Sequence, residues 1–159
     1  MNPVAIRHAT SAGDIAVAKR LFEEYAAWIA IDLSFQNFAE ELRRLPGDYA
    51  PPRGALFLAW ADARPAGCVA VRRIDDDTCE MKRLYVRDSF RGLSAGEQLA
   101  REAIEWARAA SYRRMLLDTL PSMRAAHRLY ERLGFRETPA YRFNPVEGAR
   151  FMALELDDR

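Results

Sequence analysis

Residues 80–96 read EMKRLYVRDSFRGLSAG, and this stretch is the most informative part of the chain about its fold. It begins inside a strand-like run at 78–86 and continues through a polar, glycine-containing loop at 87–95. From Gly96 to Ala110 the apolar side chains then follow helical spacing. A strand-to-helix junction directs backbone N–H groups and the positive end of the helix dipole toward one place. The stretch therefore predicts a position suited to a phosphate or pyrophosphate.

The loop from Arg91 to Gly96 is a weak phosphate-binding motif when it is taken alone. Glycine lets the backbone approach a ligand closely, and Arg91 adds a fixed positive charge. Glycine-bearing loops between a strand and a helix are common, however, so this pattern leaves a purely structural turn open. The loop does not end in Gly-Lys-Ser/Thr and lacks the three-glycine spacing of dinucleotide-binding folds, which excludes those two phosphate-binding motifs.

Outward from this segment, the chain predicts the element order β-α-α-β-β-β-α-β-α-β-β. An antiparallel meander followed by two β-α units favours a mixed sheet with helices on both faces. Asp14 and Ser122 are the expected helix N-caps, Gly134 is the expected glycine after the last helix, and 62–65 is an expected hairpin turn. Strands are expected at 4–7, 55–61, 66–73, 78–86, 115–119, 135–138 and 150–156, with helices at 14–29, 35–45, 96–110 and 122–133.

A second stretch, residues 129–135, reads LYERLGF, and together with residues 81–96 it resembles the GNAT superfamily of acetyltransferases. The family's loop pattern is Gln/Arg-x-x-Gly-x-Gly/Ala, whose ends Arg91 and Gly96 match. Its other signature, Tyr-x-x-x-Gly-Phe, is present from Tyr130 to Phe135. The chain departs from the family at Ser94, which replaces the middle glycine, and at Met123, where many relatives have an asparagine that contacts pantetheine.

The resemblance implies an α/β (α+β) GNAT fold, with a mostly antiparallel sheet of about seven strands, and acetyl-CoA as co-substrate. Backbone groups of Leu84, Tyr85 and Val86 are then expected to bind the pantetheine arm as an added strand would. The amides of Arg91, Gly92, Leu93, Ser94, Ala95 and Gly96 are expected to bind the pyrophosphate. If position 94 requires a positive φ, its serine is strained there.

The resemblance also implies two residues for proton transfer. Tyr130 matches the tyrosine that protonates the departing CoA thiolate in many members, although an ordinary buried tyrosine fits the pattern too. Glu80 is placed as catalytic glutamates are in several members, with a surface carboxylate paired to Lys82 or an arginine as the alternative. Strand alternation gives Glu80 the parity of Lys82, Leu84 and Val86 unless a bulge intervenes. Lys82 is expected to be solvated, with a charge beside the cofactor as the alternative.

The first two predicted helices and one late loop border the acceptor in this family. Trp28, Phe35 and Phe38 are therefore expected either to line the acceptor pocket or to belong to the core. The segment 141–145 is expected to fold over the acceptor.

Length and composition agree with one soluble domain spanning 1–159. The 159 residues carry a formal net charge of +1, which disfavours a nucleic-acid partner, and no apolar run approaches the roughly 20 residues of a membrane span. No leader segment is recognisable, so a cytoplasmic protein with Cys68 and Cys79 as buried free thiols is expected. His8 and His127 have no partners at metal-ligand spacing, so no metal is expected.

Three readings of the function remain open from the sequence. The first is direct acetyl transfer to a primary amine of a small molecule or peptide, without a covalent enzyme intermediate. The second is a non-catalytic module that binds CoA or a partner, and the third is a transferase that uses another acyl-CoA. The acceptor cannot be read from the sequence, and a homodimer is expected only as the commonest closed assembly.

Overall fold

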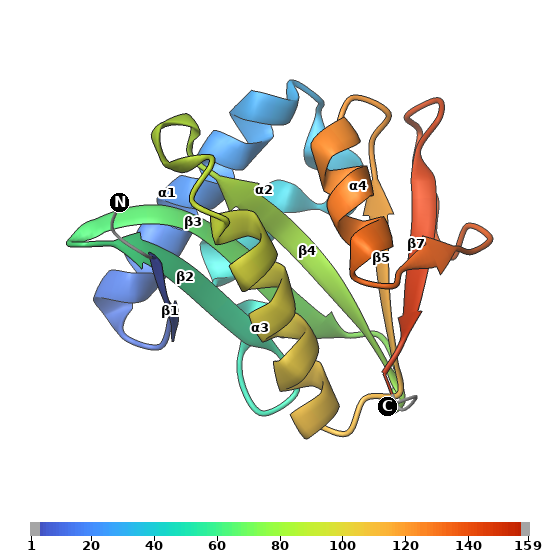
Figure 1. Cartoon of the computed structure of the whole chain (residues 1–159), viewed down its shortest axis with the longest axis horizontal. Helices are drawn as coiled ribbons and strands as arrows, with labels where there is room; N and C mark the ends of the chain where they lie inside the picture. Colours follow the sequence, from blue (N-terminus) through green and yellow to red (C-terminus); the bar gives the residue numbers. More distant parts are fainter. Residues whose placement is uncertain (1–3, 157–159) are drawn as a thin grey trace.

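The computed structural model describes residues 4–156 as a seven-stranded sheet covered by helices on both faces (Figure 1). The strand order is β1-β2-β3-β4-β5-β7-β6. Strands β4 and β5 pair in parallel, while the other neighbours pair antiparallel. The strands are β1 (Val4–His8), β2 (Ala55–Ala61), β3 (Arg64–Arg73), β4 (Thr78–Val86), β5 (Arg114–Thr119), β6 (Arg136–Glu137) and β7 (Arg150–Glu155).

Within residues 4–156, four α-helices form the outer layers, and the element order predicted from the sequence is confirmed. Figure 1 shows α3 and α4 in front of the sheet and α1 and α2 behind it. The helices are α1 (Ala12–Ile29), α2 (Phe38–Arg44), α3 (Ala95–Ala109) and α4 (Arg124–Arg132), with 3₁₀ turns at Leu33–Gln36, Gly47–Tyr49 and Asp88–Phe90. No helix within residues 4–156 is long and apolar enough to cross a bilayer.

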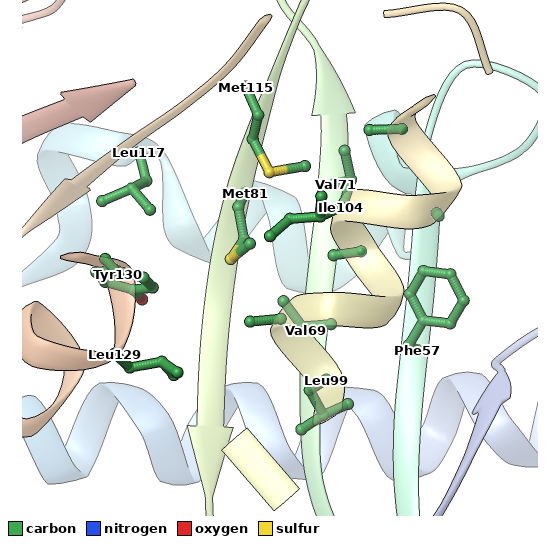
Figure 2. Close-up of a cluster of buried hydrophobic side chains, with 14 of the residues drawn as sticks. Phe57, Val69, Val71, Met81, Leu99, Ile104, Met115, Leu117, Leu129 and Tyr130 are labelled. Atoms are coloured by element: carbon green, nitrogen blue, oxygen red, sulfur yellow. The ribbon is translucent and has the colours of Figure 1, made fainter. Parts of the chain in front are cut away.

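The sheet separates two apolar cores. The larger core lies under α3 and α4, where Leu99 and Ile104 of α3 cover Val69 and Val71 of β3 (Figure 2). The smaller core lies under α1, where Leu21 and Phe22 pack against Leu58 of β2. Because helices cover both faces of the central strands, side chains in the middle of β3 and β4 are buried whichever way they point, while those at the strand ends are partly exposed.

Several predicted boundaries were wrong, for local reasons. Ser11, not Asp14, caps α1, since its Oγ accepts the backbone N–H of Asp14 at 3.1 Å. Ser122 does not cap α4; the cap position is Met123, and no side chain bonds there. The predicted helix 35–45 is divided at Asn37, whose φ of 58° ends a 3₁₀ turn before α2 begins. The hairpin between β2 and β3 is tighter than predicted, since Ala61 already pairs with Arg64.

Both cysteines are buried and free, as predicted. Cys68 lies on β3 and Cys79 on β4.

Candidate active site

The central feature of the site is a separation between β4 and β5. The two strands pair only from Thr78 to Glu80 on β4, although β4 continues to Val86 and β5 to Thr119. A small cavity of about 30 Å³ lies in the separation, large enough for a water molecule. Its lining comes from α1, the 3₁₀ turn before α2, β4, β5, and α4 with its N-cap residue. The lining residues are Tyr25, Gln36, Met81, Lys82, Arg83, Leu84, Asp118, Met123 and Tyr130. The part of β4 after Glu80 therefore has a backbone edge that β5 does not occupy.

A β-bulge lies in the same part of β4. Cys68 pairs with Tyr85 and Ala70 with Lys82, so β4 has one residue more than β3 between these pairs. Arg83 has a φ of 62°, in the left-handed region. The bulge allowed for from the sequence is therefore present, and it resets the parity beyond this point: Leu84 and Val86 pack against the α3 side, whereas Tyr85 packs against the α1 side.

The bulge brings the backbones of β3 and β4 close together at Gly67. A Cβ atom at this position would lie 2.4 Å from the carbonyl oxygen of Tyr85, so only glycine fits. A bulge re-aims the side chains that follow it, which accounts for the opposite sides taken by Leu84 and Tyr85.

The loop from Arg91 to Gly96 leads into the N-terminus of α3. Gly92 has a φ of 89° and Ser94 a φ of 60°, so two loop positions adopt the left-handed region. Ser94 is the N-cap, and its side chain makes no capping hydrogen bond. The backbone N–H groups of the first turn of α3 are therefore not capped by that side chain, and the helix dipole places positive charge at the same point. The condition stated for Ser94 is met: its φ is positive, and a serine carries strain there.

Arg91 is held at the end of β4 and against α1. Its Nε donates to the carbonyl oxygen of Val86 at 3.2 Å, and its guanidinium stacks on Trp28 at 5.0 Å and pairs with Asp88 at 2.7 Å. Trp28, one of the three aromatic residues expected at the acceptor or in the core, lies beside the loop instead. Phe35 lines a groove and a small cavity, and Phe38 packs against the α1 core.

Tyr130 lines the cavity between β4 and β5 from α4 (Figure 2). Its position results from a Schellman motif: Phe135 N–H donates to the carbonyl oxygen of Tyr130 at 3.0 Å, and Gly134 N–H to that of Glu131 at 3.1 Å. Gly134 supplies the required positive φ of 102°, and the rings of Phe135 and Tyr130 pack with centroids 5.6 Å apart. The predicted Tyr-x-x-x-Gly-Phe signature is thus a helix end that fixes the tyrosine. Burial raises the pKa of the Tyr130 phenol, so it is protonated at neutral pH.

Glu80 lies at the point where β4 and β5 separate and is fully buried. The nearby donors are Arg72 Nε at 2.8 Å, the Tyr141 hydroxyl at 2.6 Å and the guanidinium of Arg142. Burial raises the pKa of Glu80, but the positive charges of Lys82, Arg142 and Arg72 and the hydrogen bond from Tyr141 outweigh it, so the pKa is lowered. The carboxylate is therefore ionised. The pairing with an arginine considered from the sequence is present, to Arg72 and Arg142, but the expected surface position was wrong because Glu80 is buried.

Lys82 is the residue whose environment was predicted wrongly. It is buried, not solvated, and its Nζ donates to Gln36 Oε1 at 3.0 Å. Burial first and the charge of Arg83 second lower the pKa of Lys82 to about 7. The next residue, Arg83, is also buried and forms a two-pronged ion pair with Glu41 of α2, at 2.8 and 2.9 Å. The burial of Lys82 and Arg83 could have been predicted from the expected central position of this strand, because a strand covered on both faces buries its polar residues too.

The segment 141–145 lies against Glu80 and Asp118 at one side of the site, and its expected closure over the acceptor stays a prediction. Besides the contacts of Tyr141 and Arg142 with Glu80, Asn144 Nδ2 donates to Asp118 Oδ2 at 3.2 Å. This segment and β3 therefore supply three of the donors around one buried carboxylate. Within residues 4–156, no group of three or more His, Cys, Asp or Glu side chains is placed to bind a metal ion.

Comparison with known proteins gives a consistent result. The sequence profile of the acetyltransferase (GNAT) family matches residues 18–135. A Schizosaccharomyces pombe protein named as an uncharacterized N-acetyltransferase is 40% identical over 145 residues, covering 90% of this chain and 89% of that protein. The N-acetylaspartate synthetase of Mus musculus is 36% identical over 110 residues, covering 69% of this chain but only 36% of the synthetase.

Solved structures match the fold over nearly the whole chain. An acetyltransferase from Streptococcus agalactiae superposes with a TM-score of 0.80 at 21% identity, covering 98% of this chain and 100% of the other. An acetyltransferase structure from Salmonella typhimurium that contains its cofactor acetyl-CoA superposes with a TM-score of 0.72 at 22% identity, covering 99% and 96%. At these identities the likeness concerns the fold.

Proposed function

The chain belongs to the GNAT family of acetyltransferases and is an acyl-CoA-dependent N-acyltransferase, and we propose that it moves the acetyl group of acetyl-CoA directly to a primary amine of a small molecule or peptide. The observation that carries this proposal is the separation of β4 from β5, with a protonated tyrosine beside the free strand edge. A cofactor arm can pair with that edge and bring its thioester to the tyrosine.

On the donor side, we assign the free backbone edge of Leu84, Tyr85 and Val86 to the pantetheine arm. We assign the amides of the loop from Arg91 to Gly96 to the pyrophosphate, because these amides and the α3 dipole converge there. The Met123 side chain has no amide group to offer to the pantetheine, and its sulfur accepts a hydrogen bond from Thr119 Oγ1 at 3.7 Å. Binding therefore depends on main-chain groups more than on this side chain.

The proposed reaction needs one proton removed and one supplied. The nitrogen of a neutral amine attacks the thioester carbonyl carbon, forming the C–N bond, and the tetrahedral intermediate then expels the CoA thiolate by breaking the C–S bond. Tyr130 gives its phenolic proton to that sulfur, and a base takes the surplus proton of the nitrogen. We assign the base to Glu80 acting through water, since its carboxylate is ionised and lies at the start of the separation.

The acceptor is proposed only as a class, an amine. The relative named N-acetylaspartate synthetase makes amino acids the first amines to test, together with polyamines and peptides. Transfer from another acyl-CoA is tested by replacing acetyl-CoA in the turnover assay described below. The homodimer and the cytoplasmic location stay predictions.

The test begins with binding. Acetyl-CoA is titrated into the purified protein by calorimetry, alongside Arg91→Glu and the matched surface control Arg101→Glu on α3. Binding that is lost in the first variant and kept in the second supports the assigned loop. An amine screen that detects free CoA thiol then tests turnover, followed by Tyr130→Phe and Glu80→Gln. Tight binding with no turnover on any amine would favour the non-catalytic module instead.

A further inference from the structure

A groove of about 500 Å³ lies next to the reaction cavity, on the α2 side of the sheet. Its walls come from β3, the following turn, the 3₁₀ segment before α2 and the loop before β7. The lining residues are Phe35, Gln36, Arg72, Arg73, Ile74, Tyr141, Arg142 and Phe143. Gln36 also lines the cavity between β4 and β5 and holds Lys82 there, so one side chain borders both spaces.

The charges of this groove are mostly positive. Arg72, Arg73 and Arg142 line it, and no carboxylate among residues 4–156 does. Beneath it, Glu80 is shared by Arg72 and Arg142, and Lys82, whose pKa is lowered to about 7, lies nearby and is partly protonated at neutral pH, so positive charge exceeds negative charge around Glu80. Asp48 approaches Arg72 at 3.9 Å and Asp76 pairs with Arg73 at 2.7 Å, but both carboxylates are largely exposed, where pairing is weak.

The arginines also have unused hydrogen-bonding capacity. The side chain of Arg142 is 20% exposed, and its Nε is buried without a hydrogen-bond partner among the described residues. Those of Arg72 and Arg73 are 28% and 43% exposed. Each guanidinium has five N–H donors in a planar fork, which matches a carboxylate in two-pronged contact.

We propose that this groove binds a carboxylate of the acceptor, so that the substrate class is an amine that also carries a carboxylate, as an amino acid or a peptide with an acidic residue does. The inference rests on the proposed acetyl transfer and names its substrate class. A carboxylate between the arginines offsets the surplus positive charge, and the amine of the same molecule passes Gln36 toward the cavity that Tyr130 lines.

The same charges select against other amines. An ammonium group without a carboxylate adds positive charge to a site that already has a surplus, and like charges at short range repel in a partly desolvated site. Polyamines are therefore expected to be poor acceptors. The surplus of positive charge around the groove also favours the neutral form of a bound amine, which is the form that attacks the thioester.

The experiment measures kcat/KM at saturating acetyl-CoA for matched acceptors: L-aspartate with L-asparagine, L-alanine with L-alaninamide, and spermidine. In the wild type, the carboxylate member of at least one pair is expected to exceed its amide by about tenfold (about 1.4 kcal/mol), a modest value because the arginines are partly exposed. Arg142→Gln and Arg73→Gln should reduce that ratio by about threefold or more. Arg101→Gln, on the far side of the sheet, should leave it unchanged. The ratio of the two kcat/KM values is measured on one preparation of each variant, so the folded fraction cancels. Arg73 is exposed enough that Arg73→Gln should fold even if Arg142→Gln does not.

The outcomes separate the two proposals. Efficient acetylation of spermidine or the amides without preference for carboxylates would overturn the groove assignment while leaving acetyl transfer intact. A carboxylate preference that both glutamine variants retain would also overturn it, because the selective charges would lie elsewhere. No acetylation of any amine would overturn the proposed function and this inference with it.

Discussion

Ser94 and Ser111 provide a test of how backbone strain is distributed in this protein. Ser94 begins α3 with a φ of 60°, and Ser111 follows the helix with a φ of 71°. The second serine occupies the glycine position of a Schellman motif. Ser111 N–H donates to the carbonyl oxygen of Arg108 and Tyr112 N–H to that of Ala107, both at 3.0 Å. Replacing either serine by glycine should therefore stabilise the fold.

The magnitude follows from two opposing effects. A left-handed conformation costs a residue with a Cβ atom about 1–2 kcal/mol, while glycine adds about 0.5–1 kcal/mol of chain entropy to the unfolded state. The expected net gain in the free energy of unfolding is about 0.5–1 kcal/mol for each serine. For a chain of this length the unfolding entropy is about 0.33 kcal/mol/K, so Tm should rise by about 1.5–3 °C.

Thermal unfolding followed by circular dichroism measures both variants, with Ser122→Gly as the matched control. Ser122 is exposed and does not have a positive φ, so its glycine variant should lose stability. Because the fold without ligand already holds Ser94 in the strained conformation, Ser94→Gly should leave the Kd for acetyl-CoA within about twofold of the wild type. A fall in Tm for Ser94→Gly, like that of the control, would refute the strain argument. If Ser94→Gly instead bound acetyl-CoA tenfold more tightly without a gain in Tm, the loop without ligand would not hold Ser94 in the strained conformation.

The other predictions concern the site. Tyr130→Phe should lower kcat by about 10²–10⁴ with an unchanged Kd for acetyl-CoA, and a kcat close to wild type would remove Tyr130 as the acid. Arg91→Glu should weaken acetyl-CoA binding by at least about tenfold in calorimetry, while Arg101→Glu should not; equal losses would indicate a general effect of charge. Glu80→Gln should lower the free energy of unfolding at pH 7 by about 3 kcal/mol in urea denaturation, because it removes the one negative charge of a buried cluster. Since the folded-state pKa of Glu80 is below its ordinary value of 4.5, its stabilisation is complete above that pH and is lost as pH falls through the folded-state pKa. The stability difference between wild type and Glu80→Gln should therefore narrow below about pH 4.5, and a constant difference would contradict the lowered pKa.

Some features of this protein were predictable because neighbouring residues determine them. The strand-loop-helix pattern of residues 80–96 and the helix end from Tyr130 to Phe135 depend on turn chemistry within a few residues, so the sequence alone predicted both. The element order followed from apolar periodicity in the same way. These local signals were sufficient for the fold, whereas the positions assigned to the cofactor came from the family resemblance and stay a proposal.

Only the tertiary structure decided how the charged residues are arranged. Lys82 and Arg83 are polar in any sequence window, and they are buried because the segment from α1 to α2 covers them. The 3₁₀ turn of this segment supplies Gln36 as a partner for Lys82, and α2 supplies Glu41 for Arg83. Likewise, Glu80 is enclosed by Arg72 and by Arg142, 62 residues away. The site's charge balance and the groove above it depend on such long-range contacts, because the energy of a charge is set by everything around it in space and not by its neighbours along the chain.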